Sequence, residues 1–376
     1  MRELLNIFEE SRLKTQAVAA VKSTDDENLL QKVIDMLEAG NIEERIENII
    51  SKDADAKRFV QQIADIIIKI KSPIEEKNKF LEDFPNGIVD TSKLLDGSGH
   101  SFADIVGSGF NVALFKVLST SLVSQGVGPG EVALAVLSPE ISWSGRAVGG
   151  GDIQVGDQAV EVKTTVSSGG RWINARKATM NMSGIEKAIV DAITKSTGNK
   201  PEDPIPARVS PAMWVSSIRP LIDEKLLEAT TKVMADGLFN HTDNSEYQQA
   251  LISGNAADIR DAILNVGYEN YKAYSKFDGI LMMDVRSESV QYFRDYPSMR
   301  GSIKVDTTYI YAPESEAMPK VSLMPVGGSS AGFSEPAVSS NPIATPSADT
   351  DKRVEIKPRK KSTKITTNKG IGRERR

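Results

Sequence analysis

Cysteine is absent from the 376-residue chain, and histidine occurs only twice, at His100 and His241. Without cysteine the protein has neither a disulfide framework nor a zinc-thiolate site, which is compatible with a reducing compartment. Two histidines so far apart do not form the paired ligands of a metalloprotease helix, and they give little basis for a histidine triad. Carboxylates and lysines are therefore the side chains that remain for catalysis.

Long apolar runs are also missing. No stretch of about 18 apolar residues occurs, so we expect no membrane-spanning segment and no membrane partner. The amino-terminal MRELLNIFEESR is charged and lacks the apolar core of a signal peptide, so we expect no secretion by that route. A hydrophobic content of 40% and a charged content of 26% are typical of one large or two modest globular domains.

The most informative stretch is a predicted β-hairpin around Gly156 and Asp157. Residues 153–155 and 159–166 are rich in β-branched side chains, which favours strands on either side of this corner. A two-residue loop places Val155 opposite Gln158. The same register places Asp152 directly opposite Glu161.

Three charged side chains then share one face of the hairpin. Asp152 and Glu161 would have Cβ atoms roughly 4.5–5.5 Å apart, and Lys163 points to the same face because side chains alternate along a strand. Val162, between the last two, points into the core. Two facing carboxylates repel each other, and a hard divalent cation such as Mg²⁺ or Ca²⁺ is the simplest compensation.

The pattern of Asp152 followed by Glu161, Val162 and Lys163 resembles the catalytic core of the PD-(D/E)XK, or restriction-endonuclease-like, nuclease superfamily. The resemblance extends upstream to Glu131, at the start of an apolar run after Pro129. It departs from the family pattern at Gly151, where the family often has proline. The matching stretch covers about 45 residues, and its motif is short and degenerate.

The resemblance implies an α/β (α+β) fold with a mixed sheet flanked by helices, and phosphodiester hydrolysis in DNA. Mg²⁺, with Mn²⁺ as a substitute, would be held by Asp152, Glu161 and the Val162 carbonyl. Lys163 would orient the attacking water and stabilise developing charge, and Glu131 would assist. The residues expected to approach the nucleic acid are Gly150, Gly151, Arg171, Arg176 and Lys177.

Each of these residues also has an ordinary structural interpretation. Alternating Glu161, Val162 and Lys163 is typical of a strand with one solvated face. Glu131 in the first turn of a helix complements the helix macrodipole. Scattered cations are commonly surface side chains. The facing Asp152 favours the nuclease interpretation, because directly opposed like charges need a cause.

Periodicity predicts the remaining elements and three regions. Residues 1–95 read as a helical module, 96–312 as the nuclease-like domain, and 313–376 as a disordered linker and tail. Helices are expected over 102–123, 131–138, 183–195, 219–234 and 244–265. Strands are expected over 277–284, 289–295 and 303–311, either extending the sheet or forming a small subdomain.

Charge divides the chain unevenly. Residues 351–376 carry eleven Lys and Arg against three Asp and Glu, whereas residues 1–350 carry 35 basic and 48 acidic side chains. A cationic tail on an acidic body suggests salt-sensitive tethering to nucleic acid. Binding to an acidic protein surface, including its own body, explains the tail equally well.

The sequence therefore predicts a Mg²⁺-dependent deoxyribonuclease. The rival from another class is a structural or interaction protein, for example a phage virion component, that uses a nuclease-like fold without turnover. A third alternative is a module that keeps a metal for stability alone. We expect a cytoplasmic or virion-associated protein whose partners are DNA and, through the amino-terminal helices or the tail, other assembly proteins. Cutting both strands would favour a dimer, a homo-oligomer of this chain, or two sequential cleavage events.

Overall fold

The computed structural model describes residues 24–46, 49, 53–121, 128–144, 150–165, 170–171, 180–199, 201, 205–313 and 316–324. The chain divides into two compact units, Met1–Ser329 and Ser330–Arg376. The helices before residue 95 thus belong to the same unit as the sheet. The basic tail, for which disorder is predicted, lies outside the described residues.

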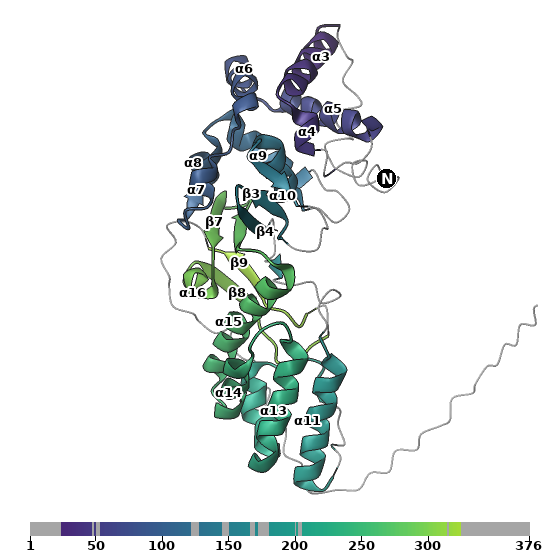
Figure 1. Ribbon diagram of the computed structural model, residues 1–376, viewed down its shortest axis with the longest axis vertical. Helices are drawn as coiled ribbons and strands as arrows, with labels where there is room; N and C mark the ends of the chain where they lie inside the picture. Colours follow the sequence, from purple (N-terminus) through teal and green to yellow (C-terminus); the bar gives the residue numbers. More distant parts are fainter. Residues whose placement is uncertain are drawn as a thin grey trace, which may run out of the picture. The chain divides into compact units, whose positions relative to one another are not determined.

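A six-stranded mixed sheet forms the centre of the first unit (Figure 1). Its strand order is β1-β7-β6-β4-β3-β2; β4 and β6 run parallel and all other neighbours are antiparallel. The strands are β1 (His100–Ser101), β2 (Ile141–Trp143), β3 (Ile153–Val155), β4 (Gln158–Thr165), β6 (Gly279–Asp284) and β7 (Ser289–Phe293). The predicted mixed sheet flanked by helices is confirmed.

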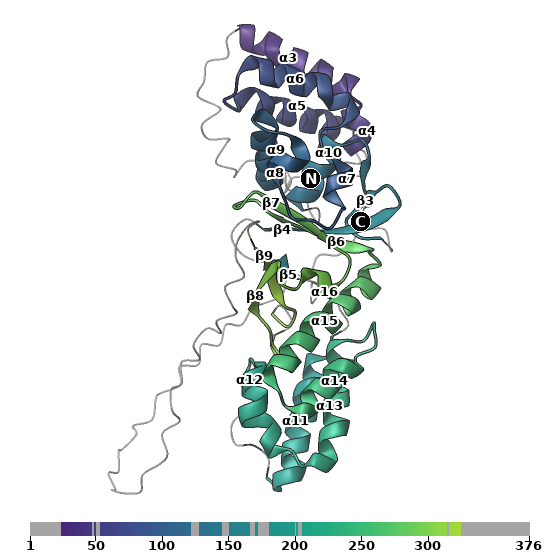
Figure 2. The same cartoon turned by 90° about the vertical axis from the view of Figure 1, so that its left-hand side faces the viewer.

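Helices cover both faces of this sheet, as Figure 2 shows. Alternate residues of β6 enter different hydrophobic clusters: Leu281 and Met283 pack with the amino-terminal helices, and Ile280 and Met282 pack with the helices that follow β4. This alternation follows from the two-residue period of a strand. The continuous apolar run of β6 is that of a central strand buried on both sides.

The helices of the amino-terminal half pack on the face that carries Val160 and Val162 of β4. They are α3 (Thr24–Ala39), α4 (Ile42–Ile46), α5 (Asp53–Lys69), α6 (Ile74–Asp83), the 3-10 turn η1 (Phe84–Asn86), α7 (Thr91–Leu94), α8 (Phe102–Val106), α9 (Phe110–Ser121) and α10 (Pro129–Leu137). The single helix predicted over 102–123 is wrong. It is broken into α8 and α9 at Gly107–Gly109, where both glycines have positive φ.

The other face is covered by elements inserted between β4 and β6. They are α11 (Met182–Thr197), α12 (Pro211–Met213), the π-helical η2 (Trp214–Ile218), the 3-10 turn η3 (Arg219–Leu221), α13 (Glu224–Leu238), α14 (Ser245–Ser253) and α15 (Ala256–Ser275). The predicted helix over 244–265 is two helices, because Asn255 starts α15 by accepting the N–H groups of Ala257 and Asp258.

A second, three-stranded sheet has the order β5-β9-β8. Its strands are β5 (Gly170–Arg171), β8 (Ile303–Thr307) and β9 (Lys320–Leu323). Helix α16 (Tyr296–Met299) directly precedes β8 in the chain. Thus β6 and β7 extend the main sheet, whereas β8 belongs to a small separate one. The linker predicted from residue 313 is wrong in its first part, since Val321 and Leu323 of β9 are buried and pair with β8.

Arg45 joins the amino-terminal helices to α10. Its guanidinium donates to the carbonyls of Val136 (3.0 Å), Phe84 (2.8 Å) and Pro85 (3.3 Å), and it lies 4.2 Å from the centre of the Phe84 ring. The residue is buried, and burial lowers the pKa of Arg45 to about 10. Its donors reach the Val136 carbonyl at the end of α10 and two carbonyls of η1, of which that of Phe84 also accepts the Gly87 N–H.

We expect Arg45→Ala to lower the free energy of unfolding by about 2–4 kcal/mol, because it leaves buried acceptors unpaired. Urea unfolding measures the change. The exposed Arg58→Ala on the adjacent α5 is the control and should cost less than about 0.5 kcal/mol. Equal effects of the two substitutions would contradict the role given to Arg45.

Candidate functional site

The predicted hairpin register is confirmed. β3 and β4 pair with Val155 opposite Gln158 and Ile153 opposite Val160, around the loop Gly156–Asp157. Before β3 the ladder is irregular, because the Asp152 N–H donates at 2.9 Å to the carbonyl of Val160, the residue opposite Ile153. The predicted pair of Asp152 with Glu161 is not part of the ladder, but Asp152 lies close to Glu161, whose charge and hydrogen bond act on its carboxyl group.

The carboxylate of Asp152 is anchored to the neighbouring strand. Its Oδ2 accepts the main-chain N–H of Val162 at 2.9 Å. Val162 lies between Glu161 and Lys163 in β4, and the side chains of these two residues lie on the same face as Asp152. The hairpin thus places both acids and the ammonium group on one patch.

Glu161 and Lys163 form an ion pair with a third partner. Oε1 of Glu161 accepts hydrogen bonds from Lys163 Nζ and from the Tyr271 hydroxyl, and Lys163 Nζ lies 2.9 Å from that same hydroxyl. The Glu161 side chain is 7% exposed and that of Lys163 is 18% exposed. The pair is therefore largely withdrawn from water, and Lys163 keeps some access to solvent.

Burial and neighbouring charges shift the pKa values in opposite directions. Burial, followed by the charge of Glu161, raises the pKa of Asp152 to about 7. Burial also acts to raise the pKa of Glu161, but the charge and hydrogen bonds of Lys163 and Tyr271 outweigh it and lower the pKa. The same pairing raises the pKa of Lys163 against the effect of burial. The ion pair stays charged, and Asp152 holds its proton unusually tightly.

Glu131 lies close enough to be influenced by Asp152, but it is held by different partners. It begins α10, where its carboxylate accepts the Gly128 N–H at 2.9 Å and the Trp143 indole N–H at 3.3 Å. Burial, then the charge of Asp152, raises the pKa of Glu131 to about 8. Glu131 therefore lies in the first turn of a helix, as predicted, and it caps that helix by accepting the Gly128 N–H.

The residues expected to approach nucleic acid are placed only in part. Gly151 has a φ of +62°, and a Cβ there would lie 2.7 Å from the Val160 carbonyl, so the chain itself requires glycine at this position. Gly150 precedes it at the start of the described segment. Arg171 lies in β5, and Arg176 and Lys177 lie outside the described residues.

Sequence reasoning missed two side chains of the site, Tyr271 and Trp143. Tyr271 is far from the hairpin in the chain and reaches it only because β4 and β6 pair, which brings α15 against the sheet. Trp143 lies in the short β2 beside β3. An aromatic residue with a polar tip, Tyr271, on the apolar face of a helix was the available signal.

The donor set fits a hard divalent cation held by few protein ligands. Among the described residues, no group of three or more His, Asp and Glu side chains is arranged to hold a metal ion. Mg²⁺, however, is commonly bound by one or two carboxylates and several waters. Asp152 and Glu161 offer carboxylate oxygens on one face, and burial, followed by the charge of Glu161, raises the pKa of Asp152 to about 7.

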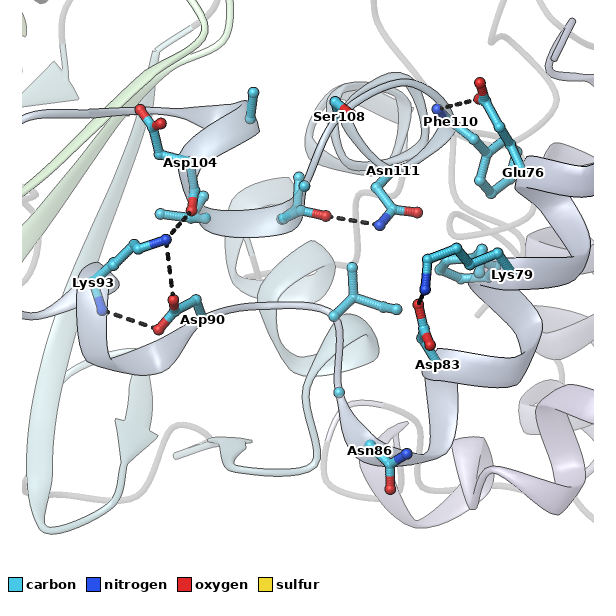
Figure 3. Close-up of a pocket in the computed structure, with 17 residues that line it drawn as sticks. Glu76, Lys79, Asp83, Asn86, Asp90, Lys93, Asp104, Ser108, Phe110 and Asn111 are labelled. Carbon is cyan, nitrogen blue, oxygen red and sulfur yellow. Dashed lines mark hydrogen bonds and ion pairs between the residues drawn. The ribbon is translucent and has the colours of Figure 1, made fainter. Parts of the chain in front are cut away.

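A pocket of about 700 Å³ lies elsewhere, between α6, α7, α8 and the start of α9 (Figure 3). Its carboxylates already have partners within the protein: Glu76 accepts the Phe110 N–H, and Asp83 pairs with Lys79. The residues that line it are Glu76, Lys79, Phe80, Asp83, Asn86, Gly87, Ile88, Asp90, Lys93, Ala103, Asp104, Ile105, Val106, Gly107, Ser108, Phe110 and Asn111. None of the four predicted catalytic residues is among them.

Comparison with known proteins gave no match to a protein-family model, a curated protein or a solved structure. Within the described ranges, no helix has both the length and the apolar character needed to cross a bilayer, in agreement with the expectation from sequence. The interpretation of this chain therefore depends on its own residues and geometry.

We expect the free energy of unfolding of the metal-free protein to fall as pH rises from about 5 to 8. The raised pKa of Glu131 keeps its proton on the folded state up to about pH 8, whereas the unfolded state releases it near the usual pKa of 4.5. Glu131→Gln mimics the protonated group and should flatten this slope. Urea unfolding across this range, with chelator present, measures it.

Asp152 contributes in the same direction, so some slope remains in Glu131→Gln. The exposed Glu228→Gln controls for net charge. Equal slopes in wild type and Glu131→Gln would contradict a proton held at Glu131.

Proposed function

We propose that the protein is a divalent-cation-dependent nuclease that hydrolyses DNA phosphodiester bonds, built on a restriction-endonuclease-like core. The observation that carries this proposal is the convergence of Asp152, Glu161 and Lys163 on one largely buried patch, with Asp152 just before β3, Glu161 on β4 and an ammonium two residues further along β4. This arrangement matches the residue types and order of the PD-(D/E)XK pattern.

The surrounding elements support the same proposal. Helix α10, carrying Glu131, precedes the hairpin, and helices that follow the lysine strand cover the sheet. An isolated Glu-Val-Lys on a solvated strand would leave its charges exposed, whereas here the glutamate is buried and tied to a tyrosine. Strongly shifted pKa values, such as that of Asp152, cluster at functional sites.

Asp152, Glu161 and the Val162 carbonyl would hold the cation. When bound, Mg²⁺ neutralises negative charge on the phosphate and makes water more acidic. The protein contributes rigid placement: the Val162 N–H fixes the Asp152 carboxylate, and Lys163 and Tyr271 fix the Glu161 carboxylate. Preorganised ligands avoid reorganisation when substrate arrives.

Lys163 would meet the attacking water and the phosphate. Its ammonium has three donors, and it is partly open to solvent. A compact cation at this position orients a lone pair of water and stabilises charge that develops on the phosphate oxygens. Loss of the ammonium should therefore slow the reaction more than it weakens DNA binding.

Glu131 would assist without touching the substrate. Its carboxylate bonds fix the start of α10 and the Trp143 indole, both beside the hairpin. Gly130 lets the helix lie close to β4, because a Cβ there would come within 2.0 Å of the Thr164 hydroxyl. Glu131 thus supports the strand that carries Glu161 and Lys163.

Mg²⁺ should raise the melting temperature by several degrees at pH 8 and by less at pH 6. At pH 6 the cation must displace the proton of Asp152, whose pKa is about 7. Asp152→Asn should abolish the shift at both pH values. Thermal unfolding with and without Mg²⁺ measures it; an undiminished shift in Asp152→Asn would place the cation elsewhere.

Wild-type protein should cleave DNA with Mg²⁺ or Mn²⁺, and Asp152→Asn and Lys163→Met should each lose roughly 10²–10³-fold in rate. Supercoiled, linear and single-stranded DNA are the substrates, and circular dichroism verifies folding. The exposed Lys225→Met is the matched control and should retain the wild-type rate. A folded, cation-binding wild type that cleaves none of them would favour the structural or interaction protein instead.

A further inference from the structure

We propose that Tyr271 is a positioning residue that holds the Lys163 ammonium in place once Glu161 is committed to a cation. This inference rests on the proposed function, since it assigns a role within that site. Tyr271 lies on α15, in the segment inserted between β4 and β6, so the insertion supplies part of the site as well as covering the sheet.

The Tyr271 hydroxyl is itself held rigidly. The side chain is buried, and its ring packs edge to face on Phe277 with a centroid distance of 5.1 Å. Buried aromatic rings in such contacts have few alternative rotamers. The hydroxyl is therefore a fixed point against which a flexible lysine can be positioned.

The donors and acceptors of Tyr271 and Lys163 define the role of the tyrosine hydroxyl. Tyr271 has one donor hydrogen, which it donates to Oε1 of Glu161. Lys163 has three donor hydrogens, of which one serves Glu161 and one serves the Tyr271 oxygen at 2.9 Å. The third remains for water or a phosphate oxygen.

The two acceptors of Lys163 differ in what a cation does to them. A cation on the carboxylate of Glu161 draws charge away from Lys163 and weakens that partner. The Tyr271 oxygen is not a ligand in the proposed site, so it remains an acceptor, and its ring stays near the ammonium, 5.2 Å from Nζ. Tyr271 is then the contact that keeps the four-carbon lysine chain from swinging into solvent.

A neighbouring tyrosine provides a matched control. Tyr268 lies one turn earlier on α15 and is also buried, but its hydroxyl donates to the Phe293 carbonyl at 3.0 Å, outside the Lys163 and Glu161 contacts. Tyr271→Phe and Tyr268→Phe remove the same atom from the same helix. Only the first removes a contact to the ammonium.

The test combines turnover with a measurement on Lys163 itself. Steady-state cleavage of linear DNA with Mg²⁺ should show kcat falling roughly 10- to 100-fold in Tyr271→Phe, with KM unchanged, because the reacting group is misplaced. Tyr268→Phe should keep the wild-type kcat. In parallel, an amine-labelling reagent is applied with Ca²⁺ present, and labelling of Lys163 is followed by mass spectrometry relative to the exposed Lys225.

Lys163 should be labelled severalfold faster in Tyr271→Phe than in wild type or Tyr268→Phe. Equal labelling rates in all three would overturn the proposal, as would an equal loss of kcat in both tyrosine variants, which would indicate a packing role. The labelling result stands even if wild type cleaves no DNA. Failure of the nuclease proposal is thus distinguished from failure of the Tyr271 proposal.

Discussion

The parallel pairing of β4 with β6 is the contact on which the rest of the structure depends. Parallel neighbours cannot be joined by a tight turn, so the chain must leave the sheet after Thr165 and return at Gly279. The intervening residues form the helices that cover one face of the sheet. The pairing also brings α15 against the charged face of β4, which is how Tyr271 reaches Glu161.

Different sets of helices pack on the two faces of the sheet, and the two faces contribute differently to the site. Val160 and Val162 of β4 face the amino-terminal helices, whereas Glu161 and Lys163 face the inserted helices. One side of the strand therefore supplies stability through apolar burial, and the other supplies a dry environment in which charge–charge interactions are strong. The apolar packing on the opposite face offsets the free-energy cost of burying the ion pair and its tyrosine partner.

Local chemistry made the hairpin predictable. Gly156 and Asp157 define a two-residue loop, and the loop fixes the pairs from Val155 with Gln158 to Ile153 with Val160, so the register of the hairpin could be predicted from sequence. The breaks within the expected long helices were harder, because Gly107 and Asn255 act through backbone geometry and capping that periodicity does not show. β9 was missed because its short segment adjoins a Ser- and Pro-rich stretch. The partnership of Tyr271 with Lys163 depends on a pairing between distant strands, which no local pattern reports.

Helix α10 is short, yet polar side chains supply hydrogen-bond partners at both of its ends. The Glu131 carboxylate lies at its amino end, and the Arg45 guanidinium reaches the Val136 carbonyl near its carboxyl end. The two groups come from distant parts of the chain. The orientation of the helix beside β4 therefore depends on a residue of α4, which lies far from α10 in the sequence.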